Sequence, residues 1–243
     1  MKNIFGIFWG LWSGLMYFIW AGLAAVASFF ALQFGNEKSI YKAHWYPRYG
    51  CKTILFFSGM RYSLHNYKSI DEDAQYIFIS NHVNMVDILF VRSIINNYLK
   101  ILGKVELLKM PIMKLFAKHF AITVDRSNKK ARKQSMADMN NQLQETNVSL
   151  LIYPEGTRNK TGDILQPFKK GAFIAAIENK IPIACITNVG LEKIMPKNKM
   201  RVYPGKIEAY IDVFETAQYT LEQVDELADL VRNRMLRYLT MEQ

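Results

Sequence analysis

A histidine and an aspartate stand five residues apart, directly after an apolar run that resembles a buried strand. The run covers residues 76–79, and Ser80 and Asn81 separate it from His82, with Asp87 following. Residues five apart on one helix point about 140° from each other, so His82 and Asp87 cannot share a helix face. We therefore expect Asn84 to cap a helix, which leaves His82 on the preceding loop and Asp87 in the first turn.

In that arrangement the carboxylate of Asp87 reaches back to one imidazole nitrogen of His82. It fixes the tautomer and leaves the other nitrogen as a general base. The pair is two thirds of a Ser-His-Asp arrangement, with a substrate hydroxyl in the place of the serine. The alternative is a strand-end histidine with a purely structural hydrogen bond, and the spacing alone does not separate the two.

A second polar cluster follows the apolar stretch 148–153. Pro154 and Gly156 force a turn where that predicted strand ends, the position at which ligands gather in α/β folds. Arg158 presents a planar charged fork that suits a phosphate. Other cations stand beside predicted elements: Lys104, Arg126, Lys169 and Lys170. Each alone is typical of a solvated surface charge, but together they indicate a phosphate site.

The elements that position these residues alternate along the chain. Strands are expected at 61–67, 74–80, 99–103, 121–124, 148–153, 181–187 and 206–212. Helices are expected at 86–97, 106–119, 129–145, 171–179 and 221–239. This order predicts an α/β domain with a central, largely parallel or mixed sheet flanked by helices. The wholly apolar strand 148–153 belongs near its centre.

Residues 4–34 carry no charge. As a helix this run is about 45 Å long, against about 30 Å for the hydrocarbon core of a bilayer. The alternative is a cleaved signal peptide, but the apolar part is about twice as long as a signal requires. We favour a retained membrane segment. Gly6, Gly10 and Gly14 recur on one face and predict a surface that packs against another helix.

Residues 38–58 are the expected partner of that helix. His44, Arg48 and Lys52 form a basic stripe flanked by aromatic residues, as at a lipid headgroup boundary, and Pro47 is expected to kink or break the helix. The chain then divides into membrane-anchoring helices at 1–58 and an α/β domain at 59–243. Basic residues after the apolar run place that domain on the cytoplasmic side of the inner membrane.

Composition restricts the classes of partner. The net charge of +10 suits anionic lipid, nucleic acid or phosphorylated substrates. The chain has no aromatic-basic repeat of a nucleic-acid motif, so we expect no nucleic acid. Cys51 and Cys185 are far apart and form neither a disulfide framework nor a zinc motif.

The two motifs in this order resemble the glycerophospholipid acyltransferase family, above all the 1-acyl-sn-glycerol-3-phosphate acyltransferases. The resemblance rests on Asn81-His82 with Asp87 and on 154–158. It extends over about residues 40–215, with further similar blocks at 104–111, 125–126, 168–171 and 181–183. Departures are Val83-Asn84, where many members have Gln or Arg followed by Ser, and Lys114, where glycine is usual. They bear on the identity of the acceptor.

The resemblance implies direct acyl transfer from an acyl thioester, on CoA or acyl carrier protein, to the hydroxyl of a lysophospholipid. His82 is then the base and Asp87 its orienting partner. The phosphate-binding set implied is Lys104, Arg126, Glu155, Gly156, Thr157 and Arg158. Neither a metal nor a redox cofactor is implied. Glycerol 3-phosphate or another lysophospholipid remains an alternative acceptor. A non-catalytic, basic lipid-binding membrane protein is the alternative from another class.

Overall fold

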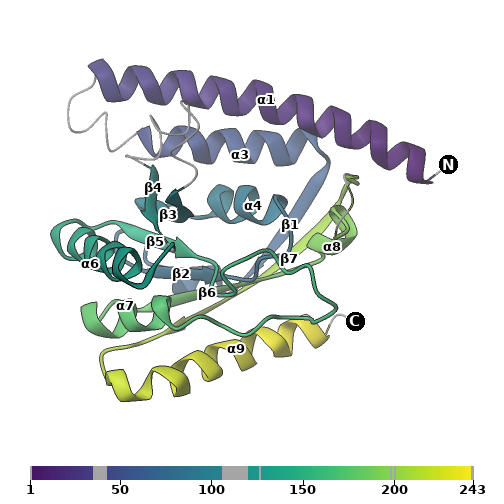
Figure 1. Ribbon diagram of the computed structural model, residues 1–243. Helices are drawn as coiled ribbons and strands as arrows, with labels where there is room; N and C mark the ends of the chain where they lie inside the picture. The colour runs from purple at the N-terminus through teal and green to yellow at the C-terminus, as the bar shows by residue number, and fades with distance from the viewer. Residues whose placement is uncertain are drawn as a thin grey trace.

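A seven-stranded sheet between two layers of helices forms the body of the protein (Figure 1). The structure is a computed structural model that describes residues 2–34, 43–105, 120–125, 127–197, 199 and 201–241. The strands are β1 (Met60–His65), β2 (Ile77–Ser80), β3 (Leu99–Lys104), β4 (Ala121–Val124), β5 (Ser149–Ile152), β6 (Ile183–Val189) and β7 (Gly205–Phe214). Their order in the sheet is β1-β7-β6-β2-β5-β3-β4.

The sheet is mixed, which confirms the predicted fold class. All of its strand pairs are parallel except β6 with β7. β2 and β5 are neighbours near the centre, and every residue of both strands is buried. Their continuous apolar sequences arise because helices cover both faces of the sheet. The carboxyl ends of β2, β3 and β5 therefore meet at one edge.

Successive side chains of β2 enter two different cores. Phe78 joins Phe90 and Leu151 beneath α3 (Trp45–Phe57) and α4 (Val86–Ile94). Ile77 and Ile79 join the opposite core. That core is formed with α6 (Lys129–Glu145), α7 (Gly171–Asn179) and α9 (Val224–Met241). The alternation follows from the two-residue period of a strand.

Several element boundaries differ from the predicted ones. β1 ends at His65 because Asn66 adopts a left-handed conformation with φ 61°, and a short 3-10 helix, η1 (Tyr67–Ser69), follows. α4 ends at Ile94 because Ile95 is extended. The C-terminal helix begins as the 3-10 turn η3 (Leu221–Gln223). The short helix α8 (Leu191–Ile194) was not predicted, and the helix predicted at 106–119 lies outside the described residues.

The N-terminal helix α1 (Lys2–Phe34) packs along α3, as predicted. The indole nitrogens of Trp9 and Trp12 donate to the carbonyls of Ser58 (2.9 Å) and Phe57 (2.8 Å), at the C-terminal end of α3. Such carbonyls have no partner within a helix, so the two bonds join α1 to the end of α3. Pro47 neither kinks nor breaks α3, because it lies in the first turn, where its missing N–H is not needed.

The predicted packing of Gly6 and Gly14 of α1 against the second helix is wrong. A Cβ on Gly6 would lie 2.4 Å from the Tyr203 ring, so Gly6 packs against the segment before β7 and not against α3. Gly14 has no atom within 4 Å of its Cβ position. The close approach of the two helices instead occurs at Gly50 of α3, whose Cβ position is 3.1 Å from the Cβ of Ala24.

The N-terminal end of α1 is also fixed to the α/β body. Nη1 of Arg201 donates to the Asn3 side chain at 2.7 Å, and the amide of Val202 donates to the Gly6 carbonyl at 3.2 Å. α1 is about 50 Å long by its residue count, and Figure 1 shows it lying along one side of the molecule. It is therefore held near both its start and its middle.

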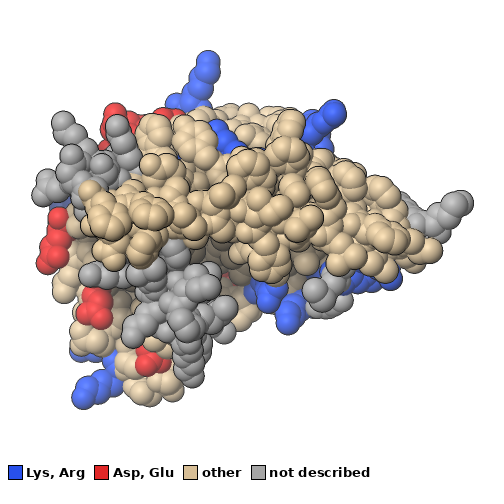
Figure 2. All heavy atoms as spheres, turned by 90° about the horizontal axis from the view of Figure 1, so that it is seen from above, with Lys and Arg blue, Asp and Glu red and all other residues tan. Residues whose placement is uncertain are grey.

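The outward face of α1 is apolar. Among the described helices, the stretch Asn3–Phe34 alone is long and apolar enough to cross a membrane, and only 11 % of its most apolar window is buried. Figure 2 shows an uncharged band over this helix, with Lys and Arg at its margins. An exposed apolar surface of this size is typical of a site that contacts a membrane or another protein.

We expect the Gly50→Leu substitution to separate α1 from α3. The added side chain enters the contact with Ala24, and overpacking costs about 1–3 kcal/mol, equivalent to a fall of roughly 2–12 °C in Tm. Thermal unfolding of detergent-solubilised protein measures it. Gly14→Leu is the control. It makes the same gain in helix propensity, but at a position where the Cβ of the added side chain meets no neighbouring atom. Equal Tm values for the two variants would contradict the described helix contact.

Candidate active site

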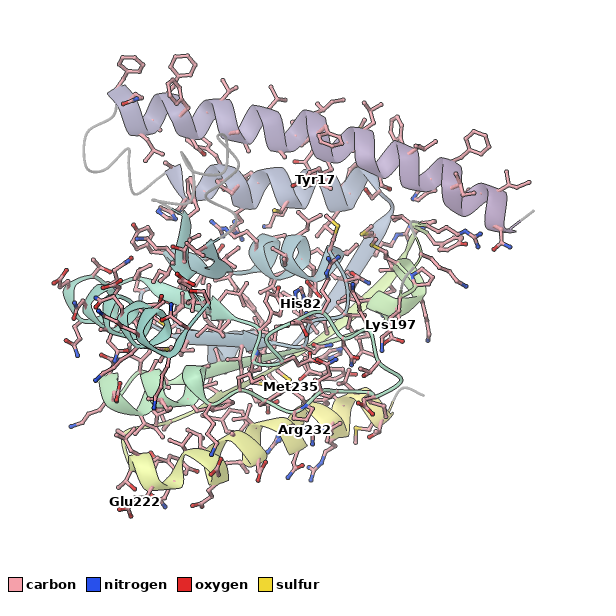
Figure 3. All side chains as sticks on the ribbon, in the orientation of Figure 1. Tyr17, His82, Lys197, Glu222, Arg232 and Met235 are labelled. Carbon is pink, nitrogen blue, oxygen red and sulfur yellow. The ribbon has the colours of Figure 1, made fainter. Side chains whose placement is uncertain are left out.

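His82 and Asp87 meet just after the carboxyl end of β2, and Figure 3 labels His82 within the fold. Nδ1 of His82 lies 2.9 Å from Oδ2 of Asp87. The Asp87 side chain is fully buried, while 15 % of the His82 side chain remains accessible. The predicted geometry is therefore confirmed: Nδ1–H donates to the carboxylate, which leaves Nε2 as the nitrogen that can accept a proton from a substrate.

Backbone amides hold the Asp87 carboxylate in place. Oδ2 also accepts from the amides of Val83 (2.7 Å) and Asn84 (3.0 Å). In return, the side-chain oxygen of Asn84 accepts from the amide of Val86 at 2.9 Å, so Asn84 and Asp87 form a reciprocal cap. The side chain of Asn84 caps the start of α4, as predicted. Met85 lies between Asn84 and the first residue of α4, and its own side chain forms no capping hydrogen bond.

Asn84 has a second role that the sequence did not indicate. Its side-chain nitrogen donates to the carbonyls of Leu191 (3.0 Å) and Met195 (2.9 Å), at the two ends of α8. The short helix after β6 is thereby joined to the loop that carries His82. The pair Val83-Asn84, which departs from the usual family residues, is thus part of the support for the site.

The turn after β5 is bound to the His82 loop at two points. Glu155 is buried, and its carboxylate accepts from the amides of His82 (2.7 Å) and Gln166 (3.1 Å). The amide of Asn159 donates to the His82 carbonyl at 2.7 Å. Burial raises the pKa of Glu155 above its usual value. These contacts support the expectation that Glu155 maintains the site, since its oxygens are occupied by backbone amides.

The same turn presents Arg158 to solvent. Gly156 has φ +77°, a conformation that strongly favours glycine, and its amide donates to the Tyr153 carbonyl at 3.0 Å. Thr157 and Arg158 follow as exposed residues. Because the next residue, Asn159, is bonded to His82, Arg158 starts at the same edge of the sheet as His82.

The other predicted cations do not share one location in the structure. Lys104 ends β3, which pairs in parallel with β5, so its backbone lies at the same sheet edge as the 154–158 turn. Arg126 lies outside the described residues, as do Pro111 and Lys114. Lys170 is engaged elsewhere, because its Nζ lies 2.7 Å from the carboxylate of Asp225.

Two residues that the prediction did not use, Tyr153 and Asn188, also build the site. Tyr153 stacks on His82, with ring centroids 4.2 Å apart and planes at 26°. Asn188 accepts from Asn81 Nδ2 at 2.9 Å and donates its own amide to Asn81 Oδ1 at 2.8 Å, which fixes the ends of β6 and β2. The signals in the sequence were a tyrosine before Pro154 and an asparagine after the apolar run 181–187. Neither indicates its partner.

An apolar cavity of about 590 Å³ lies beside the 154–158 turn. Leu102, Val124, Met136, Met139 and Ile152 are among its lining residues, and Lys169, Tyr153 and Gly156 also border it. This volume is within the range of ligand pockets. The cavity lies between the sheet and the α6–α7 layer, because Met139 and Ile152 belong to that core.

The site shows no metal-ligand pattern and no reactive thiol within the part of the chain that is described. No group of three or more His, Cys, Asp or Glu residues there could hold a metal ion. Both cysteines are buried. Burial raises the pKa of Cys51 to about 11 and the pKa of Cys185 still further, so neither is a thiolate at neutral pH.

Comparisons with known proteins identify relatives of this chain. The sequence is 32% identical over 159 residues to a 1-acyl-sn-glycerol-3-phosphate acyltransferase of Cocos nucifera, covering 64% of this chain and 51% of that protein. It is 32% identical over 163 residues to the 1-acyl-sn-glycerol-3-phosphate acyltransferase of Escherichia coli, covering 65% and 64%. The matched regions thus span about half to two thirds of these relatives.

A solved structure has the same fold. The crystal structure of the 1-acyl-sn-glycerophosphate (LPA) acyltransferase of Thermotoga maritima superimposes with a TM-score of 0.83 over 99% of this chain and 97% of that chain, at 18% identity. The family model described as Acyltransferase matches residues 61–188, more than half of the chain, including both the His82–Asp87 pair and the 154–158 turn. The chain therefore belongs to the acyltransferase family.

Proposed function

We propose that this protein is a membrane-bound O-acyltransferase that converts 1-acyl-glycerol-3-phosphate to phosphatidic acid. The observation that carries the proposal is the His82–Asp87 pair at 2.9 Å, bound through Asn159 and Glu155 to the turn that presents Arg158. A base and a candidate phosphate ligand thus arise at one sheet edge. The relatives named 1-acyl-sn-glycerol-3-phosphate acyltransferases support this choice of acceptor.

The reaction follows from the protonation state of His82. Nε2 takes the proton of the acceptor hydroxyl while its oxygen attacks the thioester carbonyl carbon. The buried charge of Asp87 stabilises the imidazolium that forms. The tetrahedral intermediate then collapses: the C–S bond breaks, an ester remains, and the thiol leaves with the proton from His82. These reaction steps require no acyl-enzyme intermediate, no metal and no redox cofactor.

The phosphate of the acceptor is assigned to Arg158 and Lys104, together with Arg126 from the family pattern. Gly156 and Thr157 shape the turn, and Glu155 holds it against His82. The apolar cavity beside the turn has the lining that an acyl chain of the donor requires. The donor thioester is carried by CoA or acyl carrier protein. A non-catalytic lipid-binding protein would have no use for a buried carboxylate that orients an accessible imidazole.

We further propose that the anchoring part, 1–58, lies in one leaflet of the inner membrane, with the 59–243 domain on its cytoplasmic side. Support comes from the bonds that hold Asn3 and Gly6 on the segment 201–202 and Trp9 and Trp12 on α3. A helix fixed at these points to the α/β body and to α3 cannot cross the bilayer without losing these bonds. Its exposed apolar residues then face the acyl chains.

The function is tested with purified protein, labelled acyl-CoA or acyl carrier protein, and three acceptors. These are lysophosphatidate, glycerol 3-phosphate and a lysophospholipid with a phosphodiester headgroup, with products separated by thin-layer chromatography. Labelled phosphatidic acid from lysophosphatidate is the expected product. We expect Arg158→Ala to raise KM for lysophosphatidate about 10- to 150-fold, because a charge-assisted hydrogen bond contributes about 1.5–3 kcal/mol.

Lys160→Ala is the control for that variant, because Lys160 is an exposed cation two residues along the same loop. It should leave both KM values unchanged. If Arg158→Ala raises KM for the thioester as much as for lysophosphatidate, Arg158 does not bind the acceptor phosphate. If the enzyme prefers one of the other two acceptors, that acceptor takes the place of lysophosphatidate in the proposal.

Substitution of His82 tests the base. His82→Ala should abolish turnover while Tm in detergent changes little. Asp87→Asn should reduce turnover by a similar or smaller amount, because the imidazole remains. His65→Ala is a matched control, because His65 Nε2 also lies 2.9 Å from a carboxylate, that of Glu208, on β7. Turnover near the wild-type value in His82→Ala would refute the mechanism.

The membrane arrangement is tested with Lys2→Cys in a Cys51→Ser, Cys185→Ser background. Sealed right-side-out cells are treated with a membrane-impermeant thiol reagent, and Glu222→Cys marks the α/β domain. We expect both cysteines to be protected until the cells are lysed. Labelling of Lys2→Cys alone from outside would show that α1 crosses the membrane, and labelling of both would place the domain outside.

A further inference from the structure

The side chain of Tyr153 covers one face of the His82 imidazole. Their ring centroids are 4.2 Å apart and the rings are 26° from parallel. Tyr153 follows β5 directly and is 9% exposed, packed with Phe78, Phe90 and Leu151 in the core beneath α4. One face of the imidazole is therefore covered by a buried aromatic ring, while 15 % of the His82 side chain remains accessible.

The two polar atoms behind this contact are both buried. Oδ2 of Asp87 accepts from His82 and from two backbone amides. Within the described residues, Oδ1 of Asp87 and the hydroxyl of Tyr153 form no hydrogen bond of normal geometry with any group. A buried carboxylate oxygen without a donor is costly, and the tyrosine hydroxyl can supply one.

Charge at the site favours that pairing. Burial, and next the negative charge of Asp87, raise the pKa of Tyr153 well above its usual value. The hydroxyl therefore keeps its proton over the whole working range of pH. Toward a carboxylate it can act only as a donor.

We propose that Tyr153 is a positioning residue for the His82–Asp87 pair, with its ring supporting the imidazolium and its hydroxyl serving Oδ1 of Asp87. The ring face is electron-rich and attracts a cation more strongly when water is excluded, so it stabilises His82 once the acceptor proton has been taken. The hydroxyl opposes that effect, because a donor on Oδ1 withdraws part of the negative charge that attracts the imidazolium. The proposal rests on the proposed function, which makes His82 the base.

The two roles predict pKa shifts of opposite sign, which a residue that only fills the core would not produce. Tyr153→Leu removes the ring and should lower the pKa of His82, by about 0.4–1.5 units. Tyr153→Phe keeps the ring, removes the donor and should raise the pKa of His82. Only the neutral imidazole acts as a base, so the acidic limb of the kcat profile should move to lower pH in Tyr153→Leu and to higher pH in Tyr153→Phe.

The shifts are measured by NMR titration of histidine-labelled full-length protein in detergent micelles, with His82→Gln assigning the resonance. The kcat profile is measured in parallel with lysophosphatidate and acyl-CoA. Tyr210 supplies matched controls, because its ring stacks on His65 at 4.5 Å, outside the site. Tyr210→Leu and Tyr210→Phe should leave the kcat profile unchanged.

The outcomes separate this proposal from the proposed function. Opposite shifts of the His82 pKa, matched by the acidic limbs, support both. If wild-type protein transfers no acyl group, the proposed function fails, while the titration still decides whether Tyr153 controls His82. An active enzyme whose His82 pKa and acidic limb are the same in wild type, Tyr153→Phe and Tyr153→Leu would overturn the positioning role. Should Tyr153→Leu fail to fold, an unshifted Tyr153→Phe overturns it alone.

Discussion

The buried carboxylate of Asp87 is the interaction on which the site depends. One of its oxygens accepts from His82 and from the amides of Val83 and Asn84, so a single charge orders a loop, a helix start and the imidazole of His82. A carboxylate with no exposure is costly unless donors surround it. The position of the loop after β2 and the geometry of the His82–Asp87 pair are therefore determined together.

The sheet supplies the second constraint. Because β2, β3 and β5 run parallel, their carboxyl ends bring together residues that are widely separated in sequence. Glu155 then binds the His82 amide from the neighbouring strand end. β7 runs antiparallel to β6, but in the strand order it lies on the opposite side of β2 from β5 and β3. The parallel strands whose ends carry the site therefore remain next to one another.

Contacts between neighbours in sequence were predictable, and contacts between strands were not. The His82–Asp87 bond and the cap by Asn84 follow from spacing, because they form within one loop and one helix turn. The stacking of Tyr153 on His82 depends on strand order and register, which hydrophobic pattern alone does not specify. For the same reason the glycines of α1 suggested the wrong neighbour: periodicity identifies a face, but not what covers it.

Under the proposed placement of α1 in one leaflet, its attachment to the α/β body has a kinetic consequence. With the helix held by Arg201 near one end and by α3 along its middle, an α1 that lies in the leaflet sets the depth of His82 relative to the lipid headgroups. An acceptor that remains in the bilayer would then reach the base by lateral diffusion. Turnover would depend on the mole fraction of lysophosphatidate in the surface, and dilution with inert lipid at constant bulk concentration would slow it.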